Sequence, residues 1–531
     1  MSLQSSMIFG FLKTPLETMI QLYTTEVIPH LTKRNKTIGI TTAIVLSSIY
    51  FIRDTIFKPP RNLRHLPYFG YFSVIRSLMK GESMFDRGYS AHIPLVNARP
   101  DGLYVEPGKV GWEVHVSNPE DVKHILLKTD VFPKADFNKG SEFGLLNKFV
   151  AGPNVIIISG DHWKSQRKVI NPAFRRSMPV KLFGQLTQEL FLTIEKLGST
   201  VDVSDLMMRC TLDAIGRAGF GFDFSAIRDS NSHWTTLYNE LTEGFRDYKF
   251  FIFPALDQSL LWLFPKRKIL HQKLDIFMDK LDQVIQSKRN QLSEGHTSNI
   301  DLEHERDLLT LMIESEQRGD GALTDLELKS NLCLFFFAGH DTTSSALSFA
   351  IYHLAKHPEI QERARAEAID ILGDEPTDIL PTAEEIKRMS YINQVMKETL
   401  RITGPVPRLG TRIATEDTIL SGTFIPKGTS VLISVFNTHH SDKIWHDPET
   451  FNPDRFSDEQ GAQGWLPFGG GSRLCIGMNF SLNEQRVMIS MLLRKYKWSF
   501  PEGSSFETEL VTSGVPVVAP EGLKMTFKKR Y

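Results

Sequence analysis

The amino-acid sequence predicts a mainly α-helical protein with small β-sheets. Two observations lead to this prediction. Helical patterns dominate from about residue 160 to residue 400, whereas strand signals gather between residues 410 and 435. This distribution indicates a helical body to which a few short strands are added.

The longest helical pattern begins at Thr324. Thr324 and Glu327 have the Ser/Thr-x-x-Glu spacing of a capping box, in which two side chains satisfy N–H groups at the start of a helix. The pattern continues to His357, just before Pro358. At 1.5 Å per residue this helix would be roughly 48 Å long, so we expect it to cross the whole domain.

The strand region contains a predicted hairpin turn. The stretch FIPKGT, residues 424–429, lies between runs of β-branched residues and includes both proline and glycine. Such a segment between two strand patterns is typical of a turn that joins paired strands.

Composition sets broad limits on function. The chain has 531 residues, 41% of them hydrophobic, which is enough for a large buried core in one large domain or two. A formal net charge of −1 argues against nucleic acid as a partner. The three cysteines, Cys210, Cys333 and Cys475, are few and far apart, so we expect no disulfide framework. No Cys-x-x-Cys or His/Cys cluster indicates zinc.

The N-terminal region differs from the rest. Residues 37–52 carry no charge and would span roughly 24 Å as a helix, somewhat less than a bilayer core of about 30 Å. We predict a membrane-anchor helix there, within a membrane-associated segment 1–57 that precedes a catalytic domain 58–531. A signal peptide and an interfacial helix are the alternatives. Orientation stays open because basic residues flank both ends: Lys33, Arg34, Lys36, Lys58, Arg61 and Arg64.

Cys475 lies in the glycine-rich stretch FGGGSRLCIG, residues 468–477. An amphipathic helical pattern follows from Met478 to Leu493, so the thiol lies near a helix N-terminus, where the dipole and free N–H groups stabilise a thiolate. The glycines would let the backbone approach a large flat group, and Arg473 could pair with an anion beside it. A buried, inert cysteine is the alternative. A thiolate, a close backbone and a nearby cation suit a haem iron and its propionates.

The spacing Phe468-x-x-Gly471-x-Arg473-x-Cys475-x-Gly477 resembles the haem-binding signature of the cytochrome P450 family, the haem-thiolate monooxygenases, in its microsomal, membrane-anchored form. Further matches extend the resemblance from about residue 60 to the end. It implies the cytochrome P450 fold, with haem b between the long central helix and the cysteine loop with its following helix. By this resemblance Cys475 is the axial iron ligand, and the other residues of the cofactor site include Phe468, Gly469, Gly477 and Ala338.

The long helix contains the stretch AGHDTT, residues 338–343. Its flanks are apolar on nearly all sides, so the polar side chains are buried and must bond to something. Gly339 costs about 1 kcal/mol relative to alanine, and we expect the helix to open locally there. The resemblance implies that Thr342 supports dioxygen binding and that Asp341 relays protons. We expect His340 to be a packing or pocket residue.

Glu398 and Arg401 lie three residues apart on a predicted helix. Taken alone, such a pair is usually exposed and contributes a few tenths of a kcal/mol. The resemblance implies instead that the pair is buried and joined by Arg455, with a structural role in holding the cysteine loop.

Four further residues match propionate-binding positions. Trp163 and Arg167 share one helix face, and the resemblance places both near the haem propionates together with Arg473. The alternative is an interfacial tryptophan beside a solvated arginine. Arg412 best matches another propionate position, although Arg408 competes for it.

The expected activity is insertion of one oxygen atom of O2 into a lipophilic small molecule. Phe335, Phe337 and Val406 are the candidate pocket residues, and part of 143–150 would add to an apolar wall. Hydroxylation of a steroid or xenobiotic is favoured, with fatty acids and terpenoids as alternatives.

No flavin or ferredoxin domain follows Cys475, so electrons are expected from NADPH–cytochrome P450 reductase, with cytochrome b5 as a further candidate donor. We expect a single-pass protein of the endoplasmic reticulum membrane with a cytosolic catalytic domain. Two rival functions remain: a haem-thiolate isomerase or dehydratase on the same fold, and a non-enzymatic haem protein. The presence of Asp341 and Thr342 favours oxygen activation.

Overall fold

The structure is a computed structural model. It describes residues 41–42, 44–48, 54 and 57–531, except for 109, 137–143, 151, 177, 248, 251–253, 295–305, 320, 322, 459–463 and 515–516. The predicted anchor helix and most of the segment 1–57 therefore lie outside the described residues. In the part of the chain that is described, no helix has both the length and the apolar character needed to cross a membrane.

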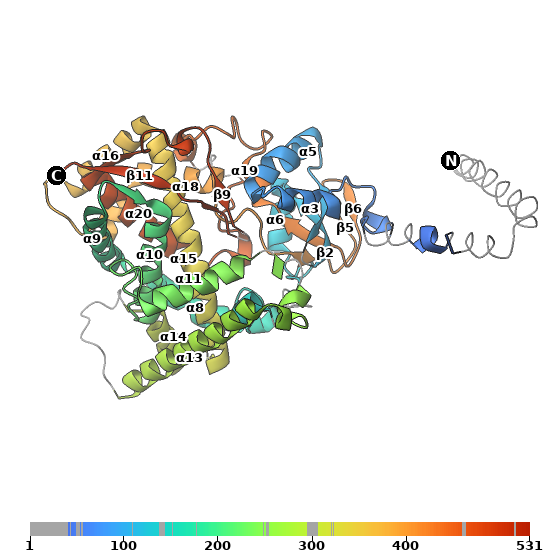
Figure 1. The fold of residues 1–531 in the computed structure, drawn as a ribbon, viewed down its shortest axis with the longest axis horizontal. Coiled ribbons are helices and arrows are strands. Elements are labelled where there is room, and N and C mark those ends of the chain that lie inside the picture. The colour runs from blue at the N-terminus through green and yellow to red at the C-terminus, as the bar shows by residue number, and fades with distance from the viewer. Residues whose placement is uncertain are drawn as a thin grey trace, which may run out of the picture.

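Helices make up most of the molecule; the larger group of them gathers on one side, and a smaller group lies on the other side beside β2, β5 and β6 (Figure 1). The first half of the chain contains α3 (Tyr71–Met79), α4 (Met84–Arg87), α5 (Ile93–Ala98), α6 (Pro119–Leu127), α7 (Leu145–Val150), α8 (Gly160–Arg176), α9 (Val180–Leu197), α10 (Val203–Ile215) and α11 (His233–Arg246). The second half contains α13 (Pro265–Ser293), α14 (Leu308–Gln317), α15 (Asp325–Lys356), α16 (Pro358–Leu372), α17 (Ala383–Arg388), α18 (Ser390–Ile402), α19 (Val435–His439) and α20 (Met478–Lys495). This confirms the prediction of a mainly helical fold.

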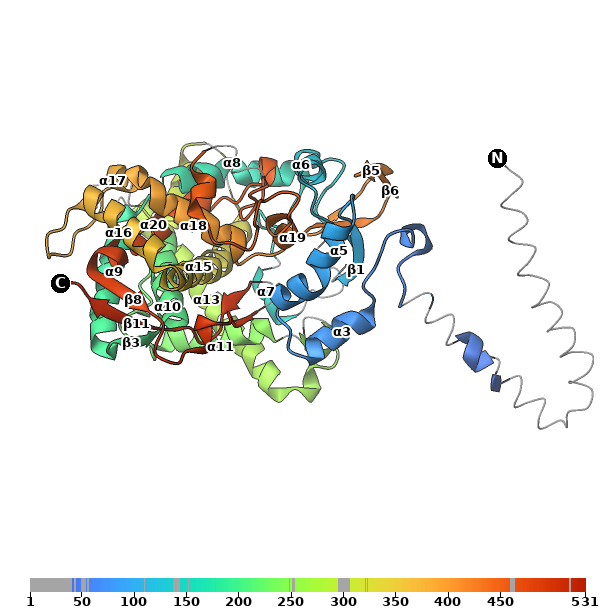
Figure 2. The same ribbon diagram turned by 90° about the horizontal axis from the view of Figure 1, so that it is seen from above.

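The predicted long helix is α15. Thr324 caps it, and both halves of the capping box form, because the Thr324 hydroxyl accepts from the N–H of Glu327 while the Glu327 carboxylate accepts from the N–H of Thr324. The helix ends at Lys356, before Pro358. It runs through the middle of the helical part, with α10, α18 and α20 packed against it (Figures 1 and 2). Burial on nearly every side explains why its sequence is apolar all round.

Strands form four small sheets among the described residues. The largest has the order β1 (Tyr104–Gly108), β2 (Gly111–Val116), β7 (Ser430–Ile433) and β4 (Arg412–Ile413). The others are β3 (Thr200–Asp202) with β11 (Lys524–Lys529) and β8 (Tyr496–Ser499), β5 (Thr418–Leu420) with β6 (Thr423–Ile425), and β9 (Thr512–Ser513) with β10 (Ala519–Pro520). Figure 2 shows β5 and β6 at an edge of the molecule, beside α6.

The predicted hairpin turn at 424–429 is wrong. The strands on either side of it, β6 and β7, do not pair: β6 pairs with β5, and β7 pairs with β2 and β4. All four residues of β7 are buried, so this strand lies inside the larger sheet, whereas only Ile425 of the three residues of β6 is buried. The actual hairpin turn is Ser421-Gly422, where both residues have positive φ, 45° and 76°.

Candidate active site

The loop before α20 presents Cys475. The N–H of Cys475 donates to the carbonyl of Phe468 at 2.9 Å, which closes the loop on itself. Gly469 and Gly471 have φ of 71° and 62°, a left-handed conformation that side chains other than glycine rarely adopt. These glycines are therefore needed for the turn, and α20 begins three residues after the thiol, as predicted.

Cys475 is the exposed thiol of the three, since Cys210 and Cys333 are buried. Solvent reaches Cys475, but the protein atoms around it still partly desolvate the sulfur, and this raises the pKa of the thiol. The N–H groups of Gly477 and Met478 and the cations Arg167 and Lys134 lower it. The predicted stabilisation of a thiolate by the helix start is present, but it does not by itself outweigh the effect of this desolvation. A coordinating metal ion deprotonates a thiol outright.

Four cations lie close to one another beside this thiol. Burial, Arg412 and Arg167 lower the pKa of Arg473 to about 10. Burial, Arg473, Arg412 and Arg167 lower the pKa of Lys134 to about 7, while the nearby Cys475 raises it. Within the described part of the chain, none of these four side chains forms an ion pair with a carboxylate. A group of like charges held this close is unfavourable unless an anion lies among them.

Trp163 brings two of these cations together. Trp163 and Arg167 are both on α8, and the guanidinium carbon of Arg167 lies 5.8 Å from the Trp163 ring centroid. The guanidinium carbon of Arg473 lies 3.9 Å from the same centroid. Arg167 also donates to the carbonyl of Leu474 at 3.2 Å, and Arg473 donates to the carbonyls of Val155 and Ile158. The matched positions Trp163, Arg167 and Arg473 therefore converge next to Cys475.

Arg408 and Arg412 have different partners. Arg408 donates to the buried carboxylate of Glu106 at 3.1 Å, and that carboxylate also binds Arg87. Arg412 donates one bond, to the carbonyl of Phe132 at 2.9 Å, and its Nε is buried without a hydrogen-bond partner among the described residues. A buried guanidinium with an unused donor fits a position that receives an anionic ligand. Arg412 is accordingly the better candidate.

One face of α15 is partly exposed in an otherwise buried stretch. Between residues 330 and 355 every residue is buried except Phe337, Ala338, Gly339 and Thr342. The expected local opening at Gly339 is not observed: the α-helix is continuous there, and the Thr342 hydroxyl donates to the Ala338 carbonyl at 2.7 Å. Ile215 packs 3.2 Å from where a Gly339 Cβ would lie, so close contact with α10 is one reason for a glycine at this position.

The exposed face of α15 lies near the cysteine loop. Ala346, one turn after Thr342, belongs to a small apolar cluster with Phe468 and Met478, which flank Cys475 in sequence. Phe174 provides a second link, because its ring meets Phe335 edge-on at 5.0 Å and lies 3.9 Å from a Cβ built on Gly477. The two matched segments are therefore brought to one place by packing.

Asp341 points to a different side of α15 from Thr342. Its carboxylate is 2% exposed, with Oδ1 3.4 Å from Nε2 of His340. His340 is fully buried, and its ring packs on Phe336 and Tyr238, with Nδ1 3.3 Å from the Tyr238 hydroxyl. His340 thus packs in the core, while adjacent residues on a helix naturally face different directions.

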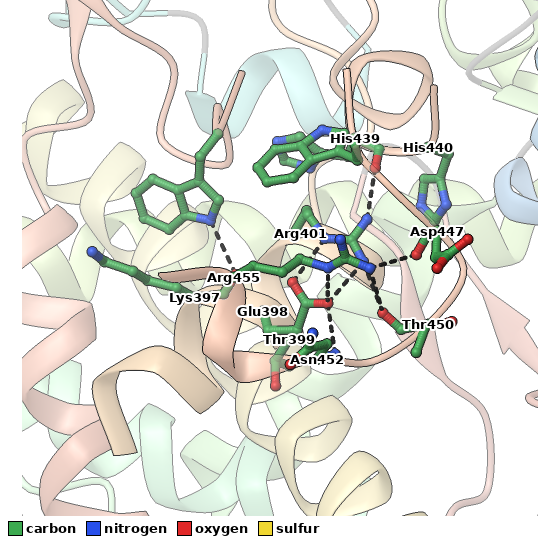
Figure 3. Close-up of polar contacts among 12 residues, drawn as sticks. Lys397, Glu398, Thr399, Arg401, His439, His440, Asp447, Thr450, Asn452 and Arg455 are labelled. Carbon is green, nitrogen blue, oxygen red and sulfur yellow. Dashed lines mark hydrogen bonds and ion pairs between the residues drawn. The ribbon is translucent and has the colours of Figure 1, made fainter. Parts of the chain in front are cut away.

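Glu398 lies at the centre of a network of polar contacts (Figure 3). Arg401 binds the Glu398 carboxylate through two bonds, of 2.7 and 2.9 Å, and both side chains are fully buried. Arg455 donates to the same carboxylate at 3.3 Å. Arg401 also donates to the carbonyl of His439, whose ring accepts from the N–H of Leu466, two residues before Phe468. The structure thus places Glu398, Arg401 and Arg455 together and connects them to the cysteine loop.

Among the candidate pocket residues, Phe337 is partly exposed and meets Phe245 edge-on at 6.1 Å. Phe335 is buried against Phe174, and Val406 is partly exposed. Phe143, the first residue of the expected apolar wall, lies outside the described residues. The sequence analysis did not identify Lys134 as a residue of the candidate site, because no local pattern surrounds it. Only the fold brings it close to Arg167, Arg412 and Arg473.

Comparison with known proteins agrees with this geometry. Residues 111–527 match the model of the family described as Cytochrome P450. The chain belongs to the cytochrome P450 family. Cytochrome P450 4A11 of Homo sapiens is 30% identical over 405 residues, which cover 73% of this chain and 75% of that protein. Cytochrome P450 4F2 of Homo sapiens is 28% identical over 429 residues, which cover 78% and 81%.

A solved structure shares the fold. The crystal structure of the cytochrome P450DA heme domain matches with a TM-score of 0.73 and 22% identity, covering 90% of this chain and 99% of that one. The predicted cytochrome P450 fold is thereby confirmed. This cytochrome P450 is a haem-binding, haem-thiolate monooxygenase. The residues present fit haem, because an exposed thiol meets a cluster of cations and Arg412 at one site; among the described residues these cations have no carboxylate partner and the Nε of Arg412 has no acceptor.

Proposed function

We propose that this cytochrome P450 hydroxylates a lipophilic small molecule at the endoplasmic reticulum membrane, with electrons from a separate NADPH-dependent reductase. One atom of O2 enters a carbon–hydrogen bond of the substrate. The other atom leaves as water, and NADPH is oxidised to NADP+ in the same turnover. NADPH–cytochrome P450 reductase is the proposed donor, with cytochrome b5 as an additional one, and the proposed attachment is a single span near residues 37–52.

The observation that carries this proposal is the exposed Cys475 thiol beside four cations, near the partly exposed face of α15. Haem bound there supplies the oxidising chemistry, since a thiolate ligand favours O–O bond cleavage. Cys475 would hold the iron, while Arg412, Arg473, Arg167 and Trp163 would hold the propionates. Lys134 is a further candidate for that role, and Phe468, Gly469, Gly477 and Ala338 would border the ring.

Thr342 and Asp341 have proposed roles in proton delivery. The Thr342 hydroxyl lies on the partly exposed face, where it already bonds to the Ala338 carbonyl at 2.7 Å. It can rotate away from that carbonyl to a ligand without loss of helical hydrogen bonds. Asp341 is buried beside His340, so proton transfer from it requires its side chain or a water to reach the Thr342 face.

The proposed substrate is lipophilic because aromatic side chains dominate the neighbourhood of Phe337. Phe337 meets Phe245, which in turn stacks on Phe149 at 5.3 Å. Together with Phe335 and Val406 they would form an apolar wall, which favours ligands that lose little by leaving water. A steroid or a xenobiotic is the preferred class, with fatty acids and terpenoids as alternatives.

The test uses the purified holoprotein with reductase and NADPH. Haem absorption would first be followed across steroids, fatty acids, terpenoids and aromatic xenobiotics for a change of spin state. Each compound that produces the change would then be incubated with NADPH and analysed for a product 16 mass units heavier, as one added oxygen requires. Full turnover of an organic peroxide without NADPH would favour an isomerase or dehydratase instead. Binding without any product under every condition would favour a non-enzymatic haem protein.

A further inference from the structure

Asp257 is a buried carboxylate outside the site described above. It is 3% exposed and lies in a short 3-10 helix, η6 (Pro254–Asp257), that follows α11. Arg267 donates two bonds to it, both of 2.7 Å, and the Nε2 of His271 lies 3.0 Å from its Oδ1. The N–H of Leu145 donates to its Oδ2 at 2.7 Å. Every part of this carboxylate is therefore engaged.

These bonds join three separate elements, and Arg267 connects them to a fourth. Asp257 belongs to η6, Arg267 and His271 to the start of α13, and Leu145 is the first residue of α7. Arg267 also donates to the carbonyl of Gly244 near the end of α11, and its guanidinium stacks on Phe250 at 4.2 Å. Burial would raise the pKa of Asp257, but the bonds from Arg267, His271 and Leu145 lower it well below its ordinary value.

Two of these helices, α7 and α11, lie against part of α15. Phe149 on α7 stacks on Phe245 on α11, with ring centroids 5.3 Å apart. Phe245 in turn meets Phe337, which is on the partly exposed face of α15. A ligand that approaches this face between α7 and α11 must separate these rings. The contacts that hold α7 and α11 together therefore control how easily a ligand passes between them.

We propose that Asp257 is a positioning residue that keeps α7 and α11 closed over Phe337 and thereby sets how fast lipophilic ligands enter and leave. This inference rests on the proposed function for the class of ligand. Moving α7 away takes the Leu145 N–H from the buried Asp257 carboxylate, and moving α11 away takes the Gly244 carbonyl from Arg267. In either case a buried charge loses a hydrogen bond, which makes the open state costly. None of the contacts of Asp257, Arg267 and His271 in the described part of the chain involves Cys475 or Thr342, so the reaction itself is unaffected.

The chain offers a matched control. Lys148 on α7 and Asp275 on α13 form an ion pair between two of the elements that bond to Asp257, with Nζ–Oδ1 at 2.5 Å, but their side chains are 37% and 57% exposed. Exposed pairs contribute little to stability, because water and salt screen them. Asp275→Asn therefore removes one carboxylate between α7 and α13 without removing a buried partner.

The experiment measures binding of clotrimazole, a bulky azole that coordinates haem iron, to the ferric holoprotein by stopped-flow absorption. Asp257→Asn should raise both the association and the dissociation rate about tenfold or more, leaving Kd within about threefold, because the cover opens more often. His271→Ala should change both rates in the same direction by a smaller factor. Asp275→Asn should leave both within about twofold. Carbon monoxide, which is small, should bind all variants at similar rates.

Two results would overturn the inference. In the first, the association and dissociation rates of clotrimazole are unchanged in both Asp257→Asn and His271→Ala. In the second, only the dissociation rate rises, which means that the binding pocket is damaged and that α7 and α11 do not open more often. If Asp257→Asn does not yield folded holoprotein, His271→Ala decides, with the thermal midpoint as the check of folding. The assay needs neither reductase nor substrate, so failure of the proposed function leaves its result interpretable.

Discussion

The guanidinium of Arg473 lies over the ring of Trp163, with its central carbon 3.9 Å from the ring centroid. This contact fixes the side chain two residues before Cys475 onto α8, which also carries Arg167. Cation–π contacts of this kind contribute roughly 0.5–2 kcal/mol, depending on solvation. The pair therefore sets the distance between the cysteine loop and α8, and with it the position of the cations that surround the thiol.

Replacing Arg412 should weaken haem retention. Its buried Nε has an unused donor, so we expect it to bind a propionate, and Arg412→Gln should increase the rate of haem transfer to apomyoglobin about tenfold. Arg408→Gln is the matched variant, because it removes an arginine four residues away that already binds Glu106. It should lower the thermal midpoint and leave the transfer rate within about twofold. The opposite pattern would assign the propionate to Arg408.

Cys475→Ser should abolish the red-shifted absorption band of the reduced, carbon monoxide-bound haem. Serine keeps the size of the side chain but is a poor axial ligand at neutral pH, whereas a thiolate is readily stabilised by the metal. Cys210→Ala is the control, because Cys210 is buried and its thiol is far from titrating. A band that survives in Cys475→Ser would exclude Cys475 as the ligand, and loss of the band in Cys210→Ala would mean general instability.

Thr342→Ala should uncouple NADPH oxidation from product formation. If its hydroxyl serves proton delivery, removal should divert most reducing equivalents to hydrogen peroxide, while NADPH is still consumed. Ser348→Ala is the matched control on the same helix, since the Ser348 hydroxyl makes an equivalent bond to the carbonyl four residues earlier, at 2.8 Å. Peroxide and product would be measured per NADPH oxidised. Equal coupling in both variants would remove Thr342 from proton delivery.

His353 should make the protein less stable as the pH falls below about 6.5. Burial and the nearby His357, Lys356 and Arg401 hold the pKa of His353 well below its ordinary value of 6.5. The folded protein therefore keeps this ring neutral, while the unfolded chain takes up a proton below that value. Because the unfolded state then binds more protons, the free energy of unfolding falls with decreasing pH by up to about 1.4 kcal/mol per unit for one group.

The measurement for His353 compares thermal midpoints at pH 7.5 and 5.5. His353→Gln should lose less stability between these two conditions than the unchanged protein. His446→Gln should behave like the unchanged protein, since the His446 side chain is 89% exposed. The same pH dependence in all three proteins would show that other buried histidines, such as His115 and His439, dominate the loss.

Much of the fold could be predicted from local patterns. The capping box at Thr324 and the proline after His357 bounded α15 correctly, because both act through neighbouring residues. The pairing of β7 could not be predicted in this way. Its partner β2 lies some 300 residues earlier in the chain, and sheet order depends on which strands the tertiary core buries. A turn motif before β7 therefore suggested the wrong partner.

The candidate site, like the fold, has features that the sequence predicts and features that depend on tertiary packing. The sequence by itself determined the chemistry: a thiol at a helix start, a threonine in a buried helix, and arginines at defined spacings, all within short segments whose local geometry follows from sequence. Only the tertiary structure gave Arg408 and Arg412 different partners, brought Lys134 to the other cations, placed Asp341 beside His340 and bonded Asp257 to residues of α7 and α13. Those outcomes depend on burial and on partners far away in the chain, and a side chain's charge and bonds are set by what folding packs around it.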